Sequence, residues 1–270
     1  MRHLILGVMT VLSVIFIIGP LAIVILNSFN SVPYTVFPPP GLSLRWYGNL
    51  AAQSSFYAAA VRSVVLALLA TALALCIGTM AAYALVRYRL PFAAALKSFL
   101  LAPIVMPKIV LGVAVFMFFV RIGVIDNRSS LLLTHVLVTF PFVVVLISAA
   151  LAQFDWSLEE AAQDLGAGPI RIFLRVILPE IRTSMIVAAI FAFITSFDQV
   201  ETTLFLVRPG ANTLPIEMFL YLQKWQDPTI AALSVVLILF AALLMAILGM
   251  TLRSRSQALA LLRGNKEIVP

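Results

Sequence analysis

The feature that most constrains this chain is a series of six long apolar stretches, separated by shorter segments that carry most of its charge. A stretch of about 20 apolar residues is long enough to cross the hydrocarbon core of a bilayer as an α-helix. The sequence therefore predicts an all-α polytopic membrane protein, forming a single domain over residues 1–270. The predicted spans are residues 4–27, 61–86, 97–120, 130–152, 182–206 and 229–252.

Composition excludes a water-soluble globule. Of the 270 residues, 63% are hydrophobic and 11% are charged, whereas about 25% are charged in soluble domains. The apolar stretches lack the alternation of membrane-spanning strands, so helices, which satisfy their own backbone hydrogen bonds in lipid, are expected. The first stretch is longer than the apolar part of a signal peptide, about 7–15 residues. We therefore expect it to remain as a span.

The net charge of +7 indicates orientation in a membrane, and we expect no nucleic-acid partner. Most of the lysine and arginine residues lie at the ends of spans on the same side as both termini, which places both termini in the cytoplasm. The basic tail is expected to lie on membrane lipid at the inner leaflet. One cysteine and two separated histidines offer neither a disulfide framework nor a metal site, and we identify no catalytic residues.

The connection between the fourth and fifth predicted spans carries charges of both signs and favours helix. Ser157 followed by Glu160 fits a capping box at a helix start. Gly166 suits the end of that helix, and Pro169 suits the start of the next one. Pro179 is expected to redirect the chain before the fifth span. The pattern predicts a short helix, a sharp turn and a second helix that returns to the bilayer.

This connection, residues 153–181, resembles the EAA loop of permease subunits in binding-protein-dependent ABC importers. It matches the pattern EAA-x3-G-x9-I-x-L-P, with valine in place of the first isoleucine. The resemblance implies a coupling helix that docks on a separate ATP-hydrolysing subunit. The residues that it assigns to this coupling are Glu160, Ala161, Ala162, Gly166, Val176, Leu178 and Pro179.

Three further segments are similar to the spermidine/putrescine (polyamine) importer permeases. They are residues 43–47, which read SLRWY, residues 103–107, which read PIVMP, and residues 196–199, which read SFDQ. The resemblance implies the transmembrane domain of a type I ABC importer in the bacterial inner membrane, working by alternating access. It implies four kinds of partner or contact: a second permease subunit, two ATP-binding subunits, a periplasmic solute-binding protein, and membrane lipid.

The chain contains no G-x-x-x-x-G-K-[ST] segment that would cradle nucleotide phosphates. We therefore expect it to be no enzyme and to hold no cofactor of its own. ATP and Mg²⁺ are expected on the partner ATPase.

Ionisable groups inside predicted spans are costly and usually mark a pathway or an ion pair. Lys108 lies in the third predicted span, and Asp198 and Glu201 lie in the fifth. With Thr195 and Thr202, the two acids are spaced to share one face of a continuous helix. We predict that these five residues line the substrate pathway. A structural pair between Lys108 and an acid, or Glu201 reaching the outer interface, would be the alternatives.

The chemistry of the solute is open at this stage. A lysine in the pathway would repel a polyamine and would suit an amino-acid-like, phosphonate or other organic solute. A gradient-driven secondary transporter that uses the three ionisable groups as a relay is a further alternative, although it leaves the EAA loop unexplained. Two prolines, Pro103 and Pro107, are expected to kink the third span.

Overall fold

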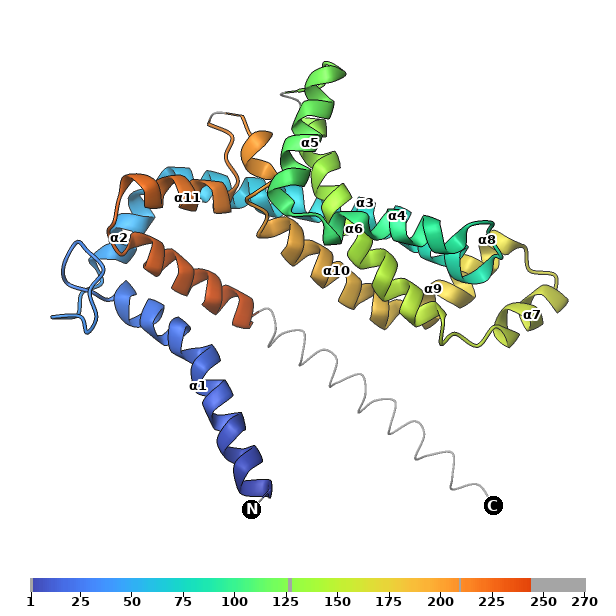
Figure 1. Ribbon diagram of the computed structural model, residues 1–270, viewed down its shortest axis with the longest axis horizontal. Coiled ribbons are helices and arrows are strands. Elements are labelled where there is room, and N and C mark those ends of the chain that lie inside the picture. The colour runs from blue at the N-terminus through green and yellow to red at the C-terminus, as the bar shows by residue number, and fades with distance from the viewer. Residues whose placement is uncertain (1, 126–127, 209, 244–270) are drawn as a thin grey trace. The chain divides into compact units, whose positions relative to one another are not determined.

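A computed structural model describes residues 2–125, 128–208 and 210–243 of the chain (Figure 1). The ordered elements in this part are helices, and only an isolated β-bridge joins Asn30 to Leu42. The all-α prediction is thus confirmed for the described residues. The chain divides into two compact units, one formed by Met1–Ser54 with Leu220–Pro270 and the other by Ser55–Phe219.

The first unit begins with helix α1 (Arg2–Ser28), which corresponds to the first predicted span. Its segment Ile5–Ser28 is long and apolar enough to cross a membrane, and none of its most apolar stretch is buried within the chain. A tight loop follows α1 and leads to α2 (Arg45–Ala52). This loop is held by Trp46, which is 4% exposed and donates its Nε1–H to the carbonyl oxygen of Asn30 over 2.6 Å.

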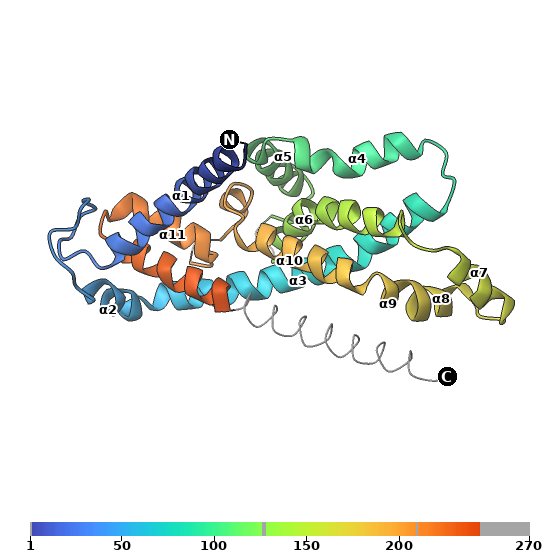
Figure 2. The same cartoon turned by 90° about the horizontal axis from the view of Figure 1, so that it is seen from below.

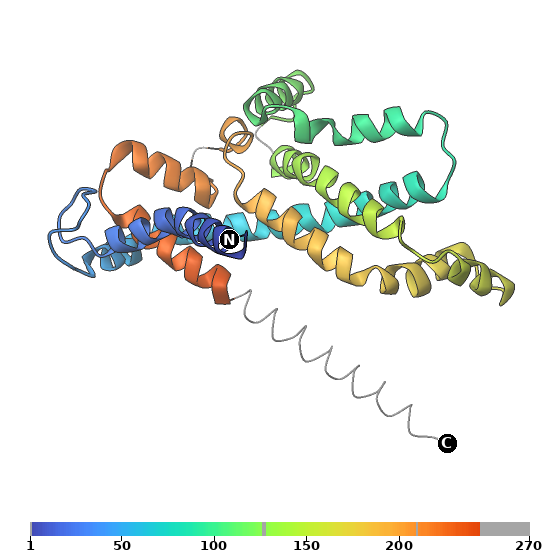
Figure 3. The ribbon, with the colours of Figure 1, turned by 60° about the horizontal axis from the view of Figure 1, so that its bottom comes forward.

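The second unit is built around α3 (Ser54–Arg87), α6 (Arg128–Leu151) and α10 (Arg182–Phe197). Helices α6 and α10 lie side by side, as Figures 1 and 3 both show. Small residues allow the close approach, which is the usual device in membrane helices. A Cβ atom added at Gly78 of α3 would lie 2.8 Å from Cγ1 of Val143 on α6. Four fully buried alanines serve the same packing: Ala74, Ala82, Ala188 and Ala192.

The third predicted span, residues 97–120, is not one helix. It is divided into α4 (Ala93–Val105) and α5 (Lys108–Arg121), which are bent by 105° relative to each other (Figure 2). The break falls at Met106, which is extended with φ −72° and ψ 137°, because a residue that precedes proline disfavours the helical region. The kink expected at Pro107 is therefore confirmed, whereas Pro103 lies inside α4.

The fifth predicted span, residues 182–206, was expected to be continuous, and this is wrong. Helix α10 ends at Phe197, turns follow, and the 3-10 turn η2 (Thr203–Phe205) closes the segment. Polar side chains here bond to the backbone and to other side chains, which competes with the helical ladder. The hydroxyl of Thr203, for example, donates to the carbonyl oxygen of Gln199 over 2.9 Å.

Before α10 the chain passes through α8 (Pro169–Ile172), a π-helical turn η1 (Phe173–Ile177) and α9 (Leu178–Glu180). The path bends by 76° between Glu180 and Arg182. Proline lacks an N–H and its ring crowds the carbonyl four residues earlier. The position of Pro179 thus accounts for the widened turn before it, and the predicted change of direction is confirmed.

Three described helices are long and apolar enough to cross a membrane, or up to five if each bent pair counts as one span. The sixth predicted span is represented by the helix Thr229–Leu243, and its last residues, 244–252, lie outside the described part. The basic tail lies outside it too. Between η2 and that helix, α11 (Leu214–Lys224) occupies the loop 207–228.

Candidate functional site

The predicted coupling loop folds as a helix, a turn and a second helix. Helix α7 (Ser157–Asp164) comes first, and Gly166 follows with φ +79°, a conformation that glycine adopts without a Cβ penalty. Pro169 is the first residue of α8. Each of these three local predictions is confirmed.

The start of α7 differs from the predicted capping box. Ser157 is the first helical residue, and its backbone N–H donates to Oδ1 of Asp155 over 3.0 Å. The hydroxyl and backbone N–H of Ser157 both lower the pKa of Asp155, because they stabilise its carboxylate. Asp155 therefore performs the role that the sequence assigned to Ser157.

An ion pair fixes α7 to the end of α3. Nε of Arg87 lies 2.8 Å from Oε2 of Glu159, whose side chain is 8% exposed. Gln163, one turn later on α7, donates to Oε1 of the same carboxylate over 3.3 Å. The acid that faces inward is thus Glu159, and the neighbouring Glu160 is exposed.

Aromatic rings surround this ion pair. The guanidinium of Arg87 lies 5.2 Å from the ring centroid of Trp156, within cation–π range. Tyr83 of α3 contacts both Trp156 and Phe173, with centroid distances of 6.3 and 5.2 Å. The loop is therefore attached to α3 through charge and through ring packing, and it would move with α3.

The residues predicted to couple to an ATPase divide into an outer and an inner set. Ala162, Val176 and Leu178 are partly buried and pack against the hydrophobic core. The exposed members are Glu160, Ala161, Gly166 and Pro179. Large apolar side chains extend the exposed surface, with Leu165 89% and Ile170 76% exposed. Exposed apolar groups beside charges are typical of an interaction surface.

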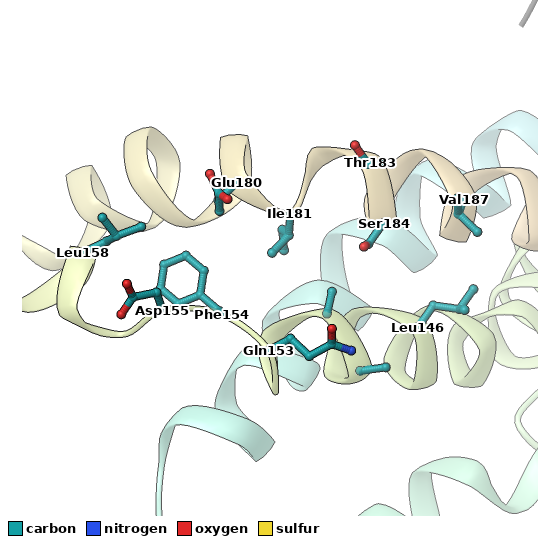
Figure 4. A pocket seen from close by; sticks show the side chains of 12 residues that line it. Leu146, Gln153, Phe154, Asp155, Leu158, Glu180, Ile181, Thr183, Ser184 and Val187 are labelled. Carbon is teal, nitrogen blue, oxygen red and sulfur yellow. The ribbon is translucent and has the colours of Figure 1, made fainter. Parts of the chain in front are cut away.

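A cavity of about 500 Å³ lies beside the loop, between the end of α6 and the α9–α10 bend. Figure 4 shows Gln153 and Asp155 on one wall and Glu180 and Ser184 on the other. Its floor is formed by apolar residues of α6 and α10. The cavity separates the base of α7 from α10, so the two walls have room to approach.

The structure brings α5, the second half of the third predicted span, against the end of the fifth. A Cβ at Gly112 of α5 would lie 2.9 Å from Cα of Thr202 and 3.1 Å from the carbonyl oxygen of Glu201. Lys108 is the first residue of α5, one turn before Gly112 and on the same face. Lys108 and Asp198 are both exposed. Among described residues, Lys108 forms no ion pair with either acid.

The predicted polar stripe does not lie on one helix. Thr195 belongs to α10, whereas Asp198, Glu201 and Thr202 follow its end. Thr202 is fully buried, and Thr195 and Glu201 are partly buried. The shared helical face is therefore wrong, although the unwound chain places Glu201 and Thr202 beside Gly112 of α5.

Sequence reasoning missed the network that holds the unwound segment. His135 of α6 is 1% exposed, and its Nδ1 lies 2.8 Å from Oγ of Ser196 while its Nε2 lies 3.0 Å from Oγ1 of Thr203. Gln199 is also 1% exposed and donates to Glu201 over 3.3 Å. His135 thus bridges the end of α10 to η2. A lone histidine inside an apolar span was the available signal.

Residues 74–259 match the protein family described as "Binding-protein-dependent transport system inner membrane component". The chain is 34% identical over 239 residues to the putrescine transport system permease protein PotI of Escherichia coli (strain K12), covering 86% of this chain and 84% of that protein. It is 30% identical over 222 residues to the spermidine/putrescine transport system permease protein PotC of the same strain, covering 82% and 84%.

Solved structures show a similar fold. A chain of a bacterial ABC transporter involved in the import of the acidic polysaccharide alginate matches with a TM-score of 0.71 and 14% identity, over 92% of this chain and 95% of that one. A chain of the MetNI methionine ABC transporter, in inward-facing conformations, matches with a TM-score of 0.60 and 19% identity, over 75% and 96%. At these identities the likeness concerns the fold alone.

Proposed function

The chain belongs to the family of binding-protein-dependent transport system inner membrane components, as a permease subunit of an ABC importer with the type I permease fold, and from that premise we propose that it moves a polyamine inward by alternating access. In this proposal two copies of an ATP-binding subunit hold the ATP and Mg²⁺. A second permease completes the pathway, and a periplasmic solute-binding protein delivers the solute. Both termini lie in the cytoplasm.

The observation that carries the coupling role is the arrangement of α7. Its inner side is attached to α3 through Arg87 and Glu159, while Glu160 and Ala161 remain exposed. A small alanine face beside a charge lets a partner approach closely. A force applied to the exposed side of α7 would pass through the ion pair into a helix of 34 residues. Such a link between two sites is what alternating access requires.

The broken spans supply the parts that would move. The 105° break at Pro107 precedes α5, which contacts Glu201 and Thr202. The 76° bend at Ile181 precedes α10, which leads to the unwound residues 198–202. Hinges are usually a few residues at the ends of elements that absorb changes in φ and ψ. We place the solute pathway along Lys108 of α5 and the segment that carries Thr195, Asp198, Glu201 and Thr202, because α5 contacts this segment at Glu201 and Thr202.

The proposed solute class rests on the relatives PotI and PotC, whose names specify putrescine and spermidine. Asp198 is exposed and its carboxylate would attract a cationic solute. Lys108 has the opposite sign and would favour a zwitterion or an organic anion, such as an amino-acid-like solute or a phosphonate. Uptake of solutes of different charge would decide between these classes.

The coupling role is tested by Glu160→Lys combined with Gly166→Pro. The first change reverses an exposed charge, and the second forbids the φ of +79° at the turn. We expect loss of copurification with the ATP-binding subunit and loss of ATP-driven uptake in proteoliposomes. Arg121→Glu, a charge reversal of the same size and opposite sign on the exposed end of α5, is the control. Normal assembly and uptake in the double variant would contradict the coupling role.

The pathway role is tested by Asp198→Ala and Lys108→Ala in the assembled importer. Asp198→Ala should reduce uptake of a diamine more than uptake of a zwitterionic amino acid, because it removes a charge that only a net cation needs. Lys108→Ala should shift the ratio in the opposite direction. Equal effects on both solutes, or no effect on either, would remove these residues from solute selection.

A further inference from the structure

A second cavity lies at the opposite end of the same unit from the coupling loop, where α3 and α6 begin. Its volume is about 440 Å³, within the range of about 300–1,000 Å³ that is typical of small-molecule sites. It is bounded by α3, by the start of α6 and by the loop that follows η2. None of the residues assigned to coupling or to the solute pathway lines it.

One wall of this cavity is an apolar strip along α3. Val61, Val65 and Leu69 are spaced four residues apart, so they share one face of the helix over about 12 Å. Each of the three is about half exposed, at 47, 50 and 51%. Leu131 and Leu132 of α6 continue the apolar surface.

Three arginines line the same cavity. Arg62 comes from α3, Arg128 from the first position of α6, and Arg208 from the loop. Arg62 donates its Nε–H to the carbonyl oxygen of Asn212 over 2.9 Å, and a guanidinium carries five N–H donors in all. Among the described residues that line the cavity, none is acidic. The side chain of Asn212 in turn donates its Nδ2–H to Oε2 of Glu217 over 2.7 Å.

Thr213 also lines the cavity, but it is 3% exposed and its hydroxyl oxygen is buried. The polar groups that can reach a ligand in the cavity are therefore chiefly those of the arginines.

From these observations we propose that the cavity binds an anionic phospholipid. Its phosphate would lie among Arg62, Arg128 and Arg208, and one acyl chain would lie along the strip of α3. Arginine forks match phosphate oxygens in a bidentate manner. A free inorganic ion would leave the apolar strip uncovered. Both α3 and α6 are long and apolar enough to cross a membrane, so a lipid would reach the start of these helices from the bilayer.

The test uses the purified importer complex that contains the full chain. The complex is exchanged into a defined mixture of equal phosphatidylglycerol and phosphatidylcholine with identical acyl chains, and the lipid retained on this subunit is counted by native mass spectrometry. We expect phosphatidylglycerol to be retained about tenfold over phosphatidylcholine, since each basic residue near the surface adds to the attraction of an anionic lipid. Equal retention of the two lipids would overturn the proposal.

Two charge variants and one steric variant identify the site. Arg128→Gln with Arg208→Gln should abolish the preference, whereas the same positions changed to lysine should keep most of it. Val65→Trp should fill the apolar strip and reduce retention with all three arginines present. Arg121→Gln, outside the cavity, is the control. The proposal would be overturned if the glutamine double variant kept the wild-type preference, or if the Arg121 control lost it equally. Displacement of the lipid by millimolar inorganic phosphate would also overturn it.

Discussion

Two adjacent glutamates at the start of α7 have different surroundings. Glu159 is buried against Arg87, and Glu160 faces outward. Both are glutamates in the first turn of α7. The sequence could therefore place them on a short helix without showing which one faces the rest of the protein. Only the position of Arg87, at the end of a helix 72 residues earlier, decides it.

We therefore expect Glu159→Gln and Arg87→Gln to uncouple ATP hydrolysis from transport. Arg87→Gln leaves the buried carboxylate of Glu159 without its partner, and Glu159→Gln leaves the exposed guanidinium of Arg87 without its partner. In either variant α7 no longer moves firmly with α3. The ATP hydrolysed per solute imported should rise about 2- to 30-fold, the range typical of changes along a coupled network. Exchanging the two residues, as Arg87→Glu with Glu159→Arg, should restore part of the coupling.

Arg175→Gln provides the matched control, because Arg175 is exposed on the same loop. If this variant uncouples as strongly as Arg87→Gln, the ion pair has no special role. The same conclusion would follow if the charge exchange recovered nothing although the complex assembled.

Gly112 belongs to the same residue scale. A side chain there meets backbone atoms of Thr202, which cannot move aside cheaply. Gly112→Ala should therefore lower the stability of the subunit by about 1–3 kcal/mol, the usual cost of overpacking. Thermal unfolding of the complex measures this. Gly19→Ala, at a helical glycine with no atom within 4 Å of the added Cβ, should cost nothing, and an equal loss in both would contradict the close contact.

In α7 the sequence predicted the C-terminal end correctly and the cap at the start wrongly. Its turn at Gly166 and the start of α8 at Pro169 follow from backbone chemistry alone. Its cap was assigned to Ser157 because serine followed by glutamate three residues later is the usual pattern. Asp155, two residues earlier, competes for the same N–H and forms the bond.

The capping carboxylate gives a prediction about pH. Because the pKa of Asp155 is lowered in the folded chain, its contribution is present above the ordinary aspartate pKa of about 3.9. That contribution is lost only as the pH falls through the lowered value. Hydrogen exchange of the α7 amides should therefore be faster in Asp155→Asn by the same factor at pH 5.5 and pH 7.5. A difference confined to one pH would contradict this role.

The broken elements show where sequence patterns stop being informative. Hydropathy located the third and fifth spans, because apolar length alone defines them. It could not show that residues 198–202 unwind, since that depends on Ser196 and Thr203 meeting His135 of another helix. The bend at Pro107 was predictable in place from proline chemistry, but its size of 105° depends on packing.

At the scale of the whole molecule, the sequence predicted the fold class from composition and the family from about 20 residues of one loop. Both are general properties that require no tertiary contact. The assignment of a solute pathway to Lys108, Asp198 and Glu201 stays a prediction, but the shape of the two spans that carry them was predicted wrongly. Lys108 was expected inside a continuous span and instead begins α5, after the break.

Orientation is a prediction about the entire chain. In a Cys76→Ala background, a cysteine at Leu165 should react with a membrane-impermeant thiol reagent only when the inner face is accessible. A cysteine at Ala211 should react from the outer face. Intact cells compared with inverted membrane vesicles supply the two conditions, and the reverse pattern would place both termini outside.

The anchoring of α7 by Arg87 also bears on how the polypeptide is made. The guanidinium is translated 72 residues before the carboxylate that it binds, so it has already been inserted when α7 leaves the ribosome. The rings that enclose the ion pair, those of Tyr83, Trp156 and Phe173, are all complete by η1. The surface that we propose for the ATP-binding subunit can therefore form cotranslationally, before the last two apolar segments have been synthesised.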